Sequence, residues 1–212
     1  QYVDAFLAEH HKKKSVGLVE KVPLKKTHAT PNDPSYAALQ PHLPQINAPN
    51  AWNVFNGNSN ITVAIVDNAV MWTHSDLVAN THTNTGEIAG NLIDDDGNGY
   101  IDDRNGFDVA DWDNNTVPTS IAQDHGTHCA GIAGARTDNN IGIASIGWNI
   151  KIIPVKCSFN GSLPAVVDAG YEGIIYAAKA KARIISCSWG GSGASVVEQT
   201  VVDYAWNKGC II

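Results

Sequence analysis

The 212-residue sequence lacks any long uninterrupted apolar run, and it has few positive charges. No run approaches the length needed to cross a bilayer, which predicts a protein without a membrane span. Lysine and arginine total 14 against 21 acidic residues, so the formal net charge is −7. A nucleic-acid partner would require a basic face, and this charge therefore argues against one.

Cysteine is also scarce, with four residues and no CxxC pair, so a zinc knuckle is not expected. Cys157, Cys187 and Cys210 lie in apolar, strand-like stretches, which favours free thiols over disulfides. Cys129 follows His125 by four residues, which raises the alternative of a cysteine nucleophile. An i, i+4 pair shares one helix face without aligning a thiol for attack, so this alternative is disfavoured.

Apolar strand patterns alternate with helical patterns from about residue 31 onward. Strands are predicted at 62–67, 150–156, 184–188 and from 210, with helices at 47–55, after 125, and at 163–181 and 195–208. Asn47 is the predicted cap of the first of these helices. Near-continuous apolar strands that alternate with helices predict an α/β fold, in which a mainly parallel sheet lies between two helical layers. The sequence stops as a strand begins, so we expect this three-layer α/β/α domain, residues 31–212, to be incomplete.

The first 30 residues have a different pattern. An amphipathic helix is predicted over 2–14 and a strand over 16–22, followed by a Pro-rich linker at 30–34. Such a helix–strand segment has no room for its own core, so residues 1–30 are expected to dock on another surface.

Two segments carry the strongest chemical signal. Asp67 ends the apolar run Val63-Ala-Ile-Val-Asp67, and His125 opens the small-residue helix His125-Gly-Thr-His-Cys-Ala-Gly131. A serine hydroxyl becomes a good nucleophile when an imidazole takes its proton, and a buried carboxylate orients that imidazole. Open α/β sheets place their sites at the carboxyl ends of strands, so Asp67 and His125 are predicted to meet in one crevice.

The same helix carries a second histidine, His128, which is expected to be structural and to bond backbone inside the protein. A metallohydrolase that uses Asp67, His125 and His128 is an alternative. The HxxH spacing differs from the HExxH of zinc peptidases, which disfavours it.

These two motifs, followed by Ile184-Ile-Ser-Cys-Ser-Trp-Gly-Gly191, resemble the subtilisin-like serine peptidases in content and order. The resemblance implies a secreted endopeptidase that acts on polypeptides, with Asp67 as the acid and His125 as the general base. It also implies that Ser188, Trp189 and Gly190 bind the substrate strand.

The resemblance extends to the ends of the sequence. Residues 1–30 are similar to the end of the family's inhibitory prodomain, which is then an expected partner. The oxyanion asparagine and the nucleophilic serine are expected beyond Ile212, so the 212-residue chain alone should hydrolyse nothing. One departure is Asn68-Ala69, where the family usually has Ser or Thr followed by Gly. The rival function is a pseudoenzyme, a calcium-binding interaction module without a nucleophile.

Two acidic loops predict structural calcium ions. In the first acidic loop (residues 94–103), oxygen ligands alternate as in an EF-hand, and the expected ligands are Asp94, Asp96, Asn98, the Tyr100 carbonyl, and Asp102 or Asp103. The second acidic loop (residues 108–115) looks like a calcium loop of some subtilisin relatives, and the expected ligands are Asp108, Asp111, Asp113 and Asn115. A solvated acidic turn is the alternative for the first acidic loop.

Overall fold

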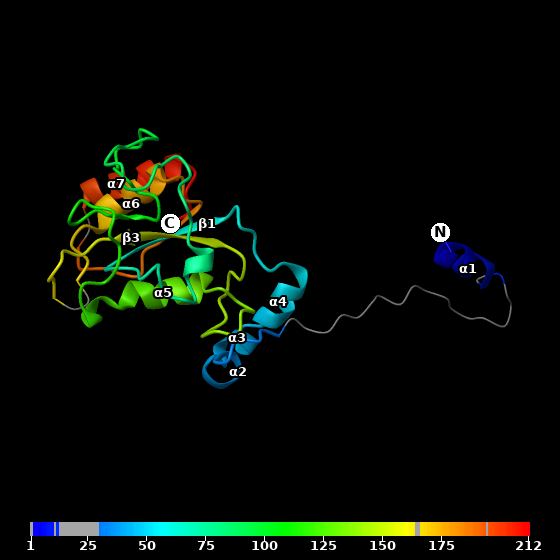
Figure 1. Ribbon diagram of the computed structural model, residues 1–212. Helices are drawn as coiled ribbons and strands as arrows, with labels where there is room; N and C mark the ends of the chain where they lie inside the picture. Colours follow the sequence, from blue (N-terminus) through cyan, green and yellow to red (C-terminus); the bar gives the residue numbers. More distant parts are fainter. Residues whose placement is uncertain (1, 11, 13–29, 164–165, 194) are drawn as a thin grey trace.

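The structure is a computed structural model that describes residues 2–10, 12, 30–163, 166–193 and 195–212 (Figure 1). Its elements, in chain order, are α1 (Tyr2–His10), α2 (Tyr36–Leu39), α3 (His42–Gln45), α4 (Ala48–Val54), β1 (Thr62–Asp67), η1 (Val78–Asn80), β2 (Phe107–Asp108), η2 (Ile121–Gln123), α5 (His125–Gly134), β3 (Lys151–Lys156), α6 (Gly170–Lys179), β4 (Ile184–Ser186) and α7 (Val196–Asn207). Within the described residues, no helix is long and apolar enough to cross a membrane.

A four-stranded parallel sheet forms the centre of the fold, in the order β2-β3-β1-β4. Lys156 on β3 is the register partner of both Asp67 on β1 and Asp108 on β2. Paired residues of parallel strands point to the same face, so these three charged side chains form a row at the carboxyl ends of the strands.

Helices cover both faces of this sheet, as Figure 1 shows with α5 on one side and α6 and α7 on the other. Successive side chains of a strand point to opposite faces, so β1 contributes to two cores. Val63 and Ile65 pack in the cluster that includes Ala130 of α5, whereas Ala64 and Val66 pack in the cluster of α6 and α7. The predicted three-layer α/β/α fold is confirmed.

The segment before β1 is tied to the loop that precedes β3. Gln40 and Ala144 exchange two hydrogen bonds of 2.8 Å, and the Trp52 indole donates to the Ile146 carbonyl at 3.0 Å. The helix predicted over 47–55 is present as α4. Asn47 holds the N-cap position of α4, as predicted. Its backbone is left-handed (φ 64°) and its side chain makes no capping hydrogen bond, so the cap lacks the expected side-chain bond.

Other boundaries also differ from the prediction. The helix predicted over 163–181 begins only at Gly170, because the Cys157 carbonyl accepts hydrogen bonds from the backbone of Asp168 and Ala169. That pairing holds residues 168 and 169 against the end of β3 instead of in a helical turn. Strand β4 ends at Ser186, two residues early, and the short strand β2 was not predicted.

Some of the elements predicted near the two ends of the sequence lie within the described residues. Helix α1 forms over Tyr2–His10, and its Phe6 side chain is 53% exposed. The strand predicted over 16–22 lies outside the described residues. At the other end, Ile211 forms a parallel bridge with Ile184, as expected for a further strand next to β4. All four cysteines are free, as predicted.

Candidate active site

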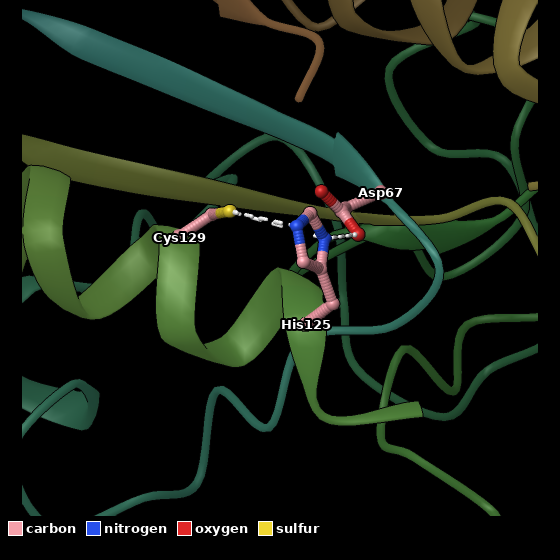
Figure 2. A group of neighbouring side chains, drawn as sticks. All are labelled: Asp67, His125 and Cys129. Atoms are coloured by element: carbon pink, nitrogen blue, oxygen red, sulfur yellow. Dashed lines mark hydrogen bonds and ion pairs between the residues drawn. The ribbon is translucent and has the colours of Figure 1, made fainter. Parts of the chain in front are cut away.

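Asp67 lies at the carboxyl end of β1 and is 1% exposed. Its Oδ1 atom lies 2.8 Å from Nδ1 of His125, the first residue of α5 (Figure 2). The same Oδ1 accepts a hydrogen bond from the Asn68 backbone at 2.7 Å. The two residues, 58 positions apart in the sequence, therefore meet as predicted.

This contact determines the state of the imidazole. A carboxylate can only accept hydrogen bonds, so Nδ1 of His125 carries the proton and Nε2 remains free to accept one. The His125 side chain is 48% exposed, whereas the Asp67 side chain is buried. The pair thus consists of a fixed acid and an accessible base, which suits proton transfer to and from a bound molecule.

Two residues bring α5 close enough to β1 for this contact. Gly126 leaves no room for a side chain, since a Cβ atom there would lie 2.4 Å from the Ala69 carbonyl oxygen and 2.7 Å from Cβ of Asp67. The buried Asn68 side chain accepts hydrogen bonds from the backbone of Gly126 at 3.0 Å and of Ala69 at 2.7 Å. The Asn68 side chain therefore links the first turn of α5 to the backbone just after β1.

We expect Asn68→Ala to destabilise the chain by about 1–3 kcal/mol, because the buried Gly126 amide loses its acceptor. Urea unfolding of the 212-residue chain measures this change. Asn60→Ala is the matched control, since Asn60 is an exposed residue just before β1, and its stability should stay within about 0.5 kcal/mol of wild type. Equal stability of Asn68→Ala and wild type would show that the Gly126 bond contributes nothing.

Cys129 lies one helical turn after His125, and its Sγ atom is 3.9 Å from both ring nitrogens of His125 (Figure 2). Burial raises the pKa of the Cys129 thiol, and the nearby Asp67 carboxylate acts in the same direction. A thiol with a raised pKa is a poor nucleophile, because the thiolate is the reactive form. The structure therefore disfavours the cysteine-nucleophile alternative although the two side chains are close.

The segment after β4 runs beside this pair. The Trp189 indole donates to the Val66 carbonyl at 2.7 Å and packs edge-on against Tyr171, with ring centroids 5.5 Å apart. Ser188 and Gly190 are exposed on either side, and Ser188 lies near enough to Cys129 to lower the pKa of its thiol. The predicted substrate-binding residues are thus placed next to the predicted catalytic pair, with Trp189 as their anchor.

Comparisons with known proteins show the family of this chain. Residues 58–212 match the model of the subtilase family. The chain belongs to the subtilase family. It is 37% identical over 186 residues to thermitase of Thermoactinomyces vulgaris, and that match covers 86% of this chain and 56% of thermitase.

Two further subtilases are similar to this chain. The extracellular protease of Xanthomonas campestris is 32% identical over 178 residues, which cover 76% of this chain and 30% of that protein. A solved protease structure from Pseudoalteromonas arctica matches with a TM-score of 0.61 and 29% identity, covering 86% of this chain and 57% of that one. The chain therefore spans about half the length of thermitase and less of the other curated relative.

His128 of this subtilase does not lie where the sequence predicted. It is exposed, and it lines an open, largely apolar groove of about 740 Å³ together with Thr127 and Ile143. Asp67 and His125 do not line that groove. Among the described residues, the potential metal ligands that converge here are Asp67, His125 and Cys129, so the ligand set of the metallohydrolase alternative is not assembled.

The first acidic loop differs from an EF-hand loop in the direction of its carboxylates. Asp94 accepts hydrogen bonds from the backbone of Asn98 and Gly99, and Asp102 accepts three from the backbone of residues 90–92. The Asn98 oxygen accepts one from Tyr100. Asp94, Asn98 and Asp102 therefore shape the loop. Asp96 and Asp103 instead approach Glu87, which the sequence prediction missed because no local spacing relates it to the loop.

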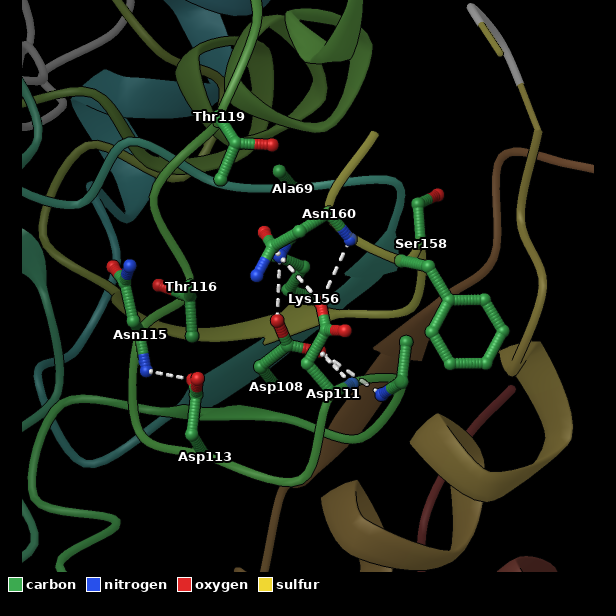
Figure 3. Close-up of polar contacts among 12 residues, drawn as sticks. Ala69, Asp108, Asp111, Asp113, Asn115, Thr116, Thr119, Lys156, Ser158 and Asn160 are labelled. Atoms are coloured by element: carbon green, nitrogen blue, oxygen red, sulfur yellow. Dashed lines mark hydrogen bonds and ion pairs between the residues drawn. The ribbon is translucent and has the colours of Figure 1, made fainter. Parts of the chain in front are cut away.

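Lys156, the last residue of β3, extends its side chain to the second acidic loop, where a calcium ion was predicted (Figure 3). The fully buried Lys156 ammonium lies 2.5 Å from Oδ2 of Asp108 and 3.4 Å from Oδ2 of Asp111, and it donates to Asn160 at 2.7 Å. Asp113 accepts from the Asn115 backbone at 2.8 Å. Lys156 therefore supplies a positive charge beside Asp108 and Asp111. Calcium at residues 108–115 stays a prediction.

Proposed function

We propose that the protein is a serine endopeptidase in which Asp67 and His125 supply the acid and the base of an Asp-His-Ser charge relay. The 2.8 Å contact between a buried carboxylate and a half-exposed imidazole carries this proposal. The nucleophilic serine is the one that the family resemblance implies outside residues 1–212. The substrates are polypeptides.

Each residue has a defined task in this reaction. Asp67 holds the proton on Nδ1 of His125, so that Nε2 accepts the proton of the attacking serine hydroxyl. The imidazolium that forms is stabilised by the same carboxylate, and it then returns its proton to the leaving amine. Burial of Asp67 strengthens this interaction, because the local dielectric constant is below that of water.

Ser188, Trp189 and Gly190 supply the edge along which the substrate would lie. An extended peptide gains affinity from main-chain hydrogen bonds, whereas side-chain pockets set selectivity. The exposed Ser188 and Gly190 backbone suits such pairing, and the indole bond to Val66 fixes the segment relative to β1.

Export and self-inhibition belong to the same proposal. A similar protease of Xanthomonas campestris is extracellular, which supports a secreted protein. The proposed prodomain remnant at residues 1–30 would be the partner that occupies the site before activation.

A fluorophosphonate probe tests the proposal, because it forms a covalent bond only with an activated serine. We expect no adduct with the 212-residue chain and rapid labelling of a longer chain that includes the family's serine segment. In that longer chain, His125→Gln should abolish labelling, and His128→Gln, an exposed change on the same helix, should leave it unchanged.

Two results would contradict the proposal. Labelling of the 212-residue chain would place the nucleophile within it, and labelling that survives His125→Gln would exclude His125 as the base. Absence of labelling in the longer chain would favour the pseudoenzyme.

A further inference from the structure

A polar cavity of about 440 Å³ lies outside the candidate active site. It is lined by two cations, Arg136 and Lys151, and by the uncharged polar side chains of Asn58, Ser59, Asn80 and Asn149. Among the described residues, no carboxylate lines it. Lys151 begins β3 and pairs in register with Thr62, whereas Asp67 ends β1. The cavity therefore lies about 16 Å from Asp67, measured along the strands at about 3.3 Å per residue.

The two cations of this cavity are held by uncharged groups. Nζ of Lys151 donates to the Ala79 carbonyl at 2.6 Å, and Nη1 of Arg136 donates to Oδ1 of Asn149 at 3.3 Å. In the described part of the chain, neither cation forms an ion pair. Burial lowers the pKa of Lys151, and the charge of Arg136 acts in the same direction. Two like charges thus share a cavity whose described lining supplies no negative charge.

The walls of the cavity are fixed by contacts between distant segments. Asn80 is 1% exposed, and its Nδ2 atom donates to the carbonyls of Gly134 at 3.1 Å and Trp148 at 3.0 Å. Gly57 has a left-handed backbone (φ 86°), and a Cβ atom there would lie 2.1 Å from the Gly147 carbonyl oxygen. The segment before β1, the end of α5 and the loop before β3 are therefore packed together. A ligand bound in such a preformed cavity loses little free energy to the ordering of its site.

We propose that this cavity binds a phosphate group, with Arg136 and Lys151 as its charged donors. A guanidinium presents a planar fork of N–H groups that matches two oxygens of a phosphate, and an ammonium adds a compact charge beside it. Two positive charges match a doubly charged anion, whereas a carboxylate would balance only one of them. Asn58 and Ser59, which are exposed at the rim, offer neutral donors for further oxygens.

The cavity is larger than an inorganic phosphate ion. It therefore also has room for the uncharged part of a phosphate monoester, such as a phosphorylated sugar. The charged oxygens are the same in both ligands, and the polar rim would contact only the organic part of the ester.

A second basic cavity, of about 510 Å³, serves as a comparison. Its cations are Lys179, Lys181, Arg183 and Lys208, all of which are exposed. Lys179 and Lys208 lie at the carboxyl ends of α6 and α7, where the helix dipole alone favours lysine. Asp96 and Asp103 line a neighbouring cavity together with the other three cations. This second group thus has negative charges near it, whereas the described lining around Arg136 and Lys151 has none.

A titration of the ¹⁵N-labelled 212-residue chain, followed by the NMR signals of its backbone amides, tests the proposal. The two titrants are inorganic phosphate and glucose 6-phosphate, and sodium chloride keeps the ionic strength constant. We expect saturable shifts at the residues that line the 440 Å³ cavity. Phosphate should also raise the melting temperature above that in chloride, because a ligand of the folded state stabilises it.

Arg136→Gln and Lys151→Met should each weaken phosphate binding about tenfold or more, because each removes a charge-assisted hydrogen bond. Lys208→Gln is the matched control, since it removes one positive charge from the second basic cavity, and it should bind phosphate as wild type does. Melting temperatures in phosphate-free buffer show that each variant is folded. With two independent variants, a folding defect in one leaves the other as the test.

Three results would overturn the proposal: no saturable shifts in wild type, equal binding by wild type and both cavity variants, or binding that only Lys208→Gln abolishes. Tighter binding of glucose 6-phosphate would identify an ester as the ligand, and equal binding would identify free phosphate. Asp67 and His125 do not enter these measurements, so their outcome is independent of the proposed peptidase function.

Discussion

In a chain that includes the family's serine segment, Asp67→Asn is expected to lower kcat about 10⁴-fold. Asparagine keeps the size of the side chain, but it can present an N–H group to Nδ1 of His125. The imidazole then carries its proton on Nε2, where it cannot accept the serine proton. Initial rates on a peptide substrate at saturating concentration measure the loss.

The control separates chemistry from folding. Asp113→Asn removes a charge from an exposed loop residue, and it should keep kcat near the wild-type value. Far-UV circular dichroism and urea unfolding should show that Asp67→Asn is folded. A kcat within tenfold of wild type would refute the assignment of Asp67, because a general base without its correct tautomer cannot work at that rate.

The sequence predicted the candidate pair because each member has a strong local signal. Asp67 ends an unbroken apolar strand, and His125 opens a helix whose glycines and alanines permit close packing. The carboxyl-end rule for parallel sheets then places both residues in one crevice. Strand and helix positions followed from the same apolar periodicity, and this is why β1, β3 and the start of α5 were predicted nearly to the residue.

What the sequence could not predict depends on contacts between distant segments. Helix α6 starts late because the Cys157 carbonyl holds the backbone at 168–169, and no local pattern reports that bond. Glu87 was not singled out from the sequence, although the fold buries it beside Asp103. The second acidic loop carried a calcium-like spacing, but the cation it meets is a lysine from β3, 48 residues away from Asp108.

Substitution of Lys156 is expected to cause the largest change in stability. Lys156→Met leaves the buried Asp108 carboxylate with its two backbone donors, at Ala110 and Asp111, but without a close positive charge. Removal of one member of a buried ion pair costs about 3–5 kcal/mol. Urea unfolding of the 212-residue chain at neutral pH should show a loss of that size.

Acid should reduce this loss. Burial raises the pKa of Asp108, and Lys156 acts against that rise, so the substitution removes the main opposing influence. A carboxyl group with a raised pKa in the folded state favours folding when protonated, and its contribution is lost as the pH rises through that pKa. The difference in unfolding free energy between Lys156→Met and wild type should therefore shrink as the pH falls.

A double variant isolates the pair. Asp108→Asn combined with Lys156→Met removes both charges and keeps the oxygen that accepts from Ala110 and Asp111, so it should recover most of the lost stability. Lys151→Met is the matched control on the same strand. The partly exposed Lys151 donates to the Ala79 carbonyl, and its substitution should cost about 1 kcal/mol. No recovery in the double variant would show that Lys156 acts through packing and not through charge. Calcium that restored the stability of Lys156→Met would reveal a latent cation site among Asp108, Asp111 and Asp113, which the ammonium fills in the native chain.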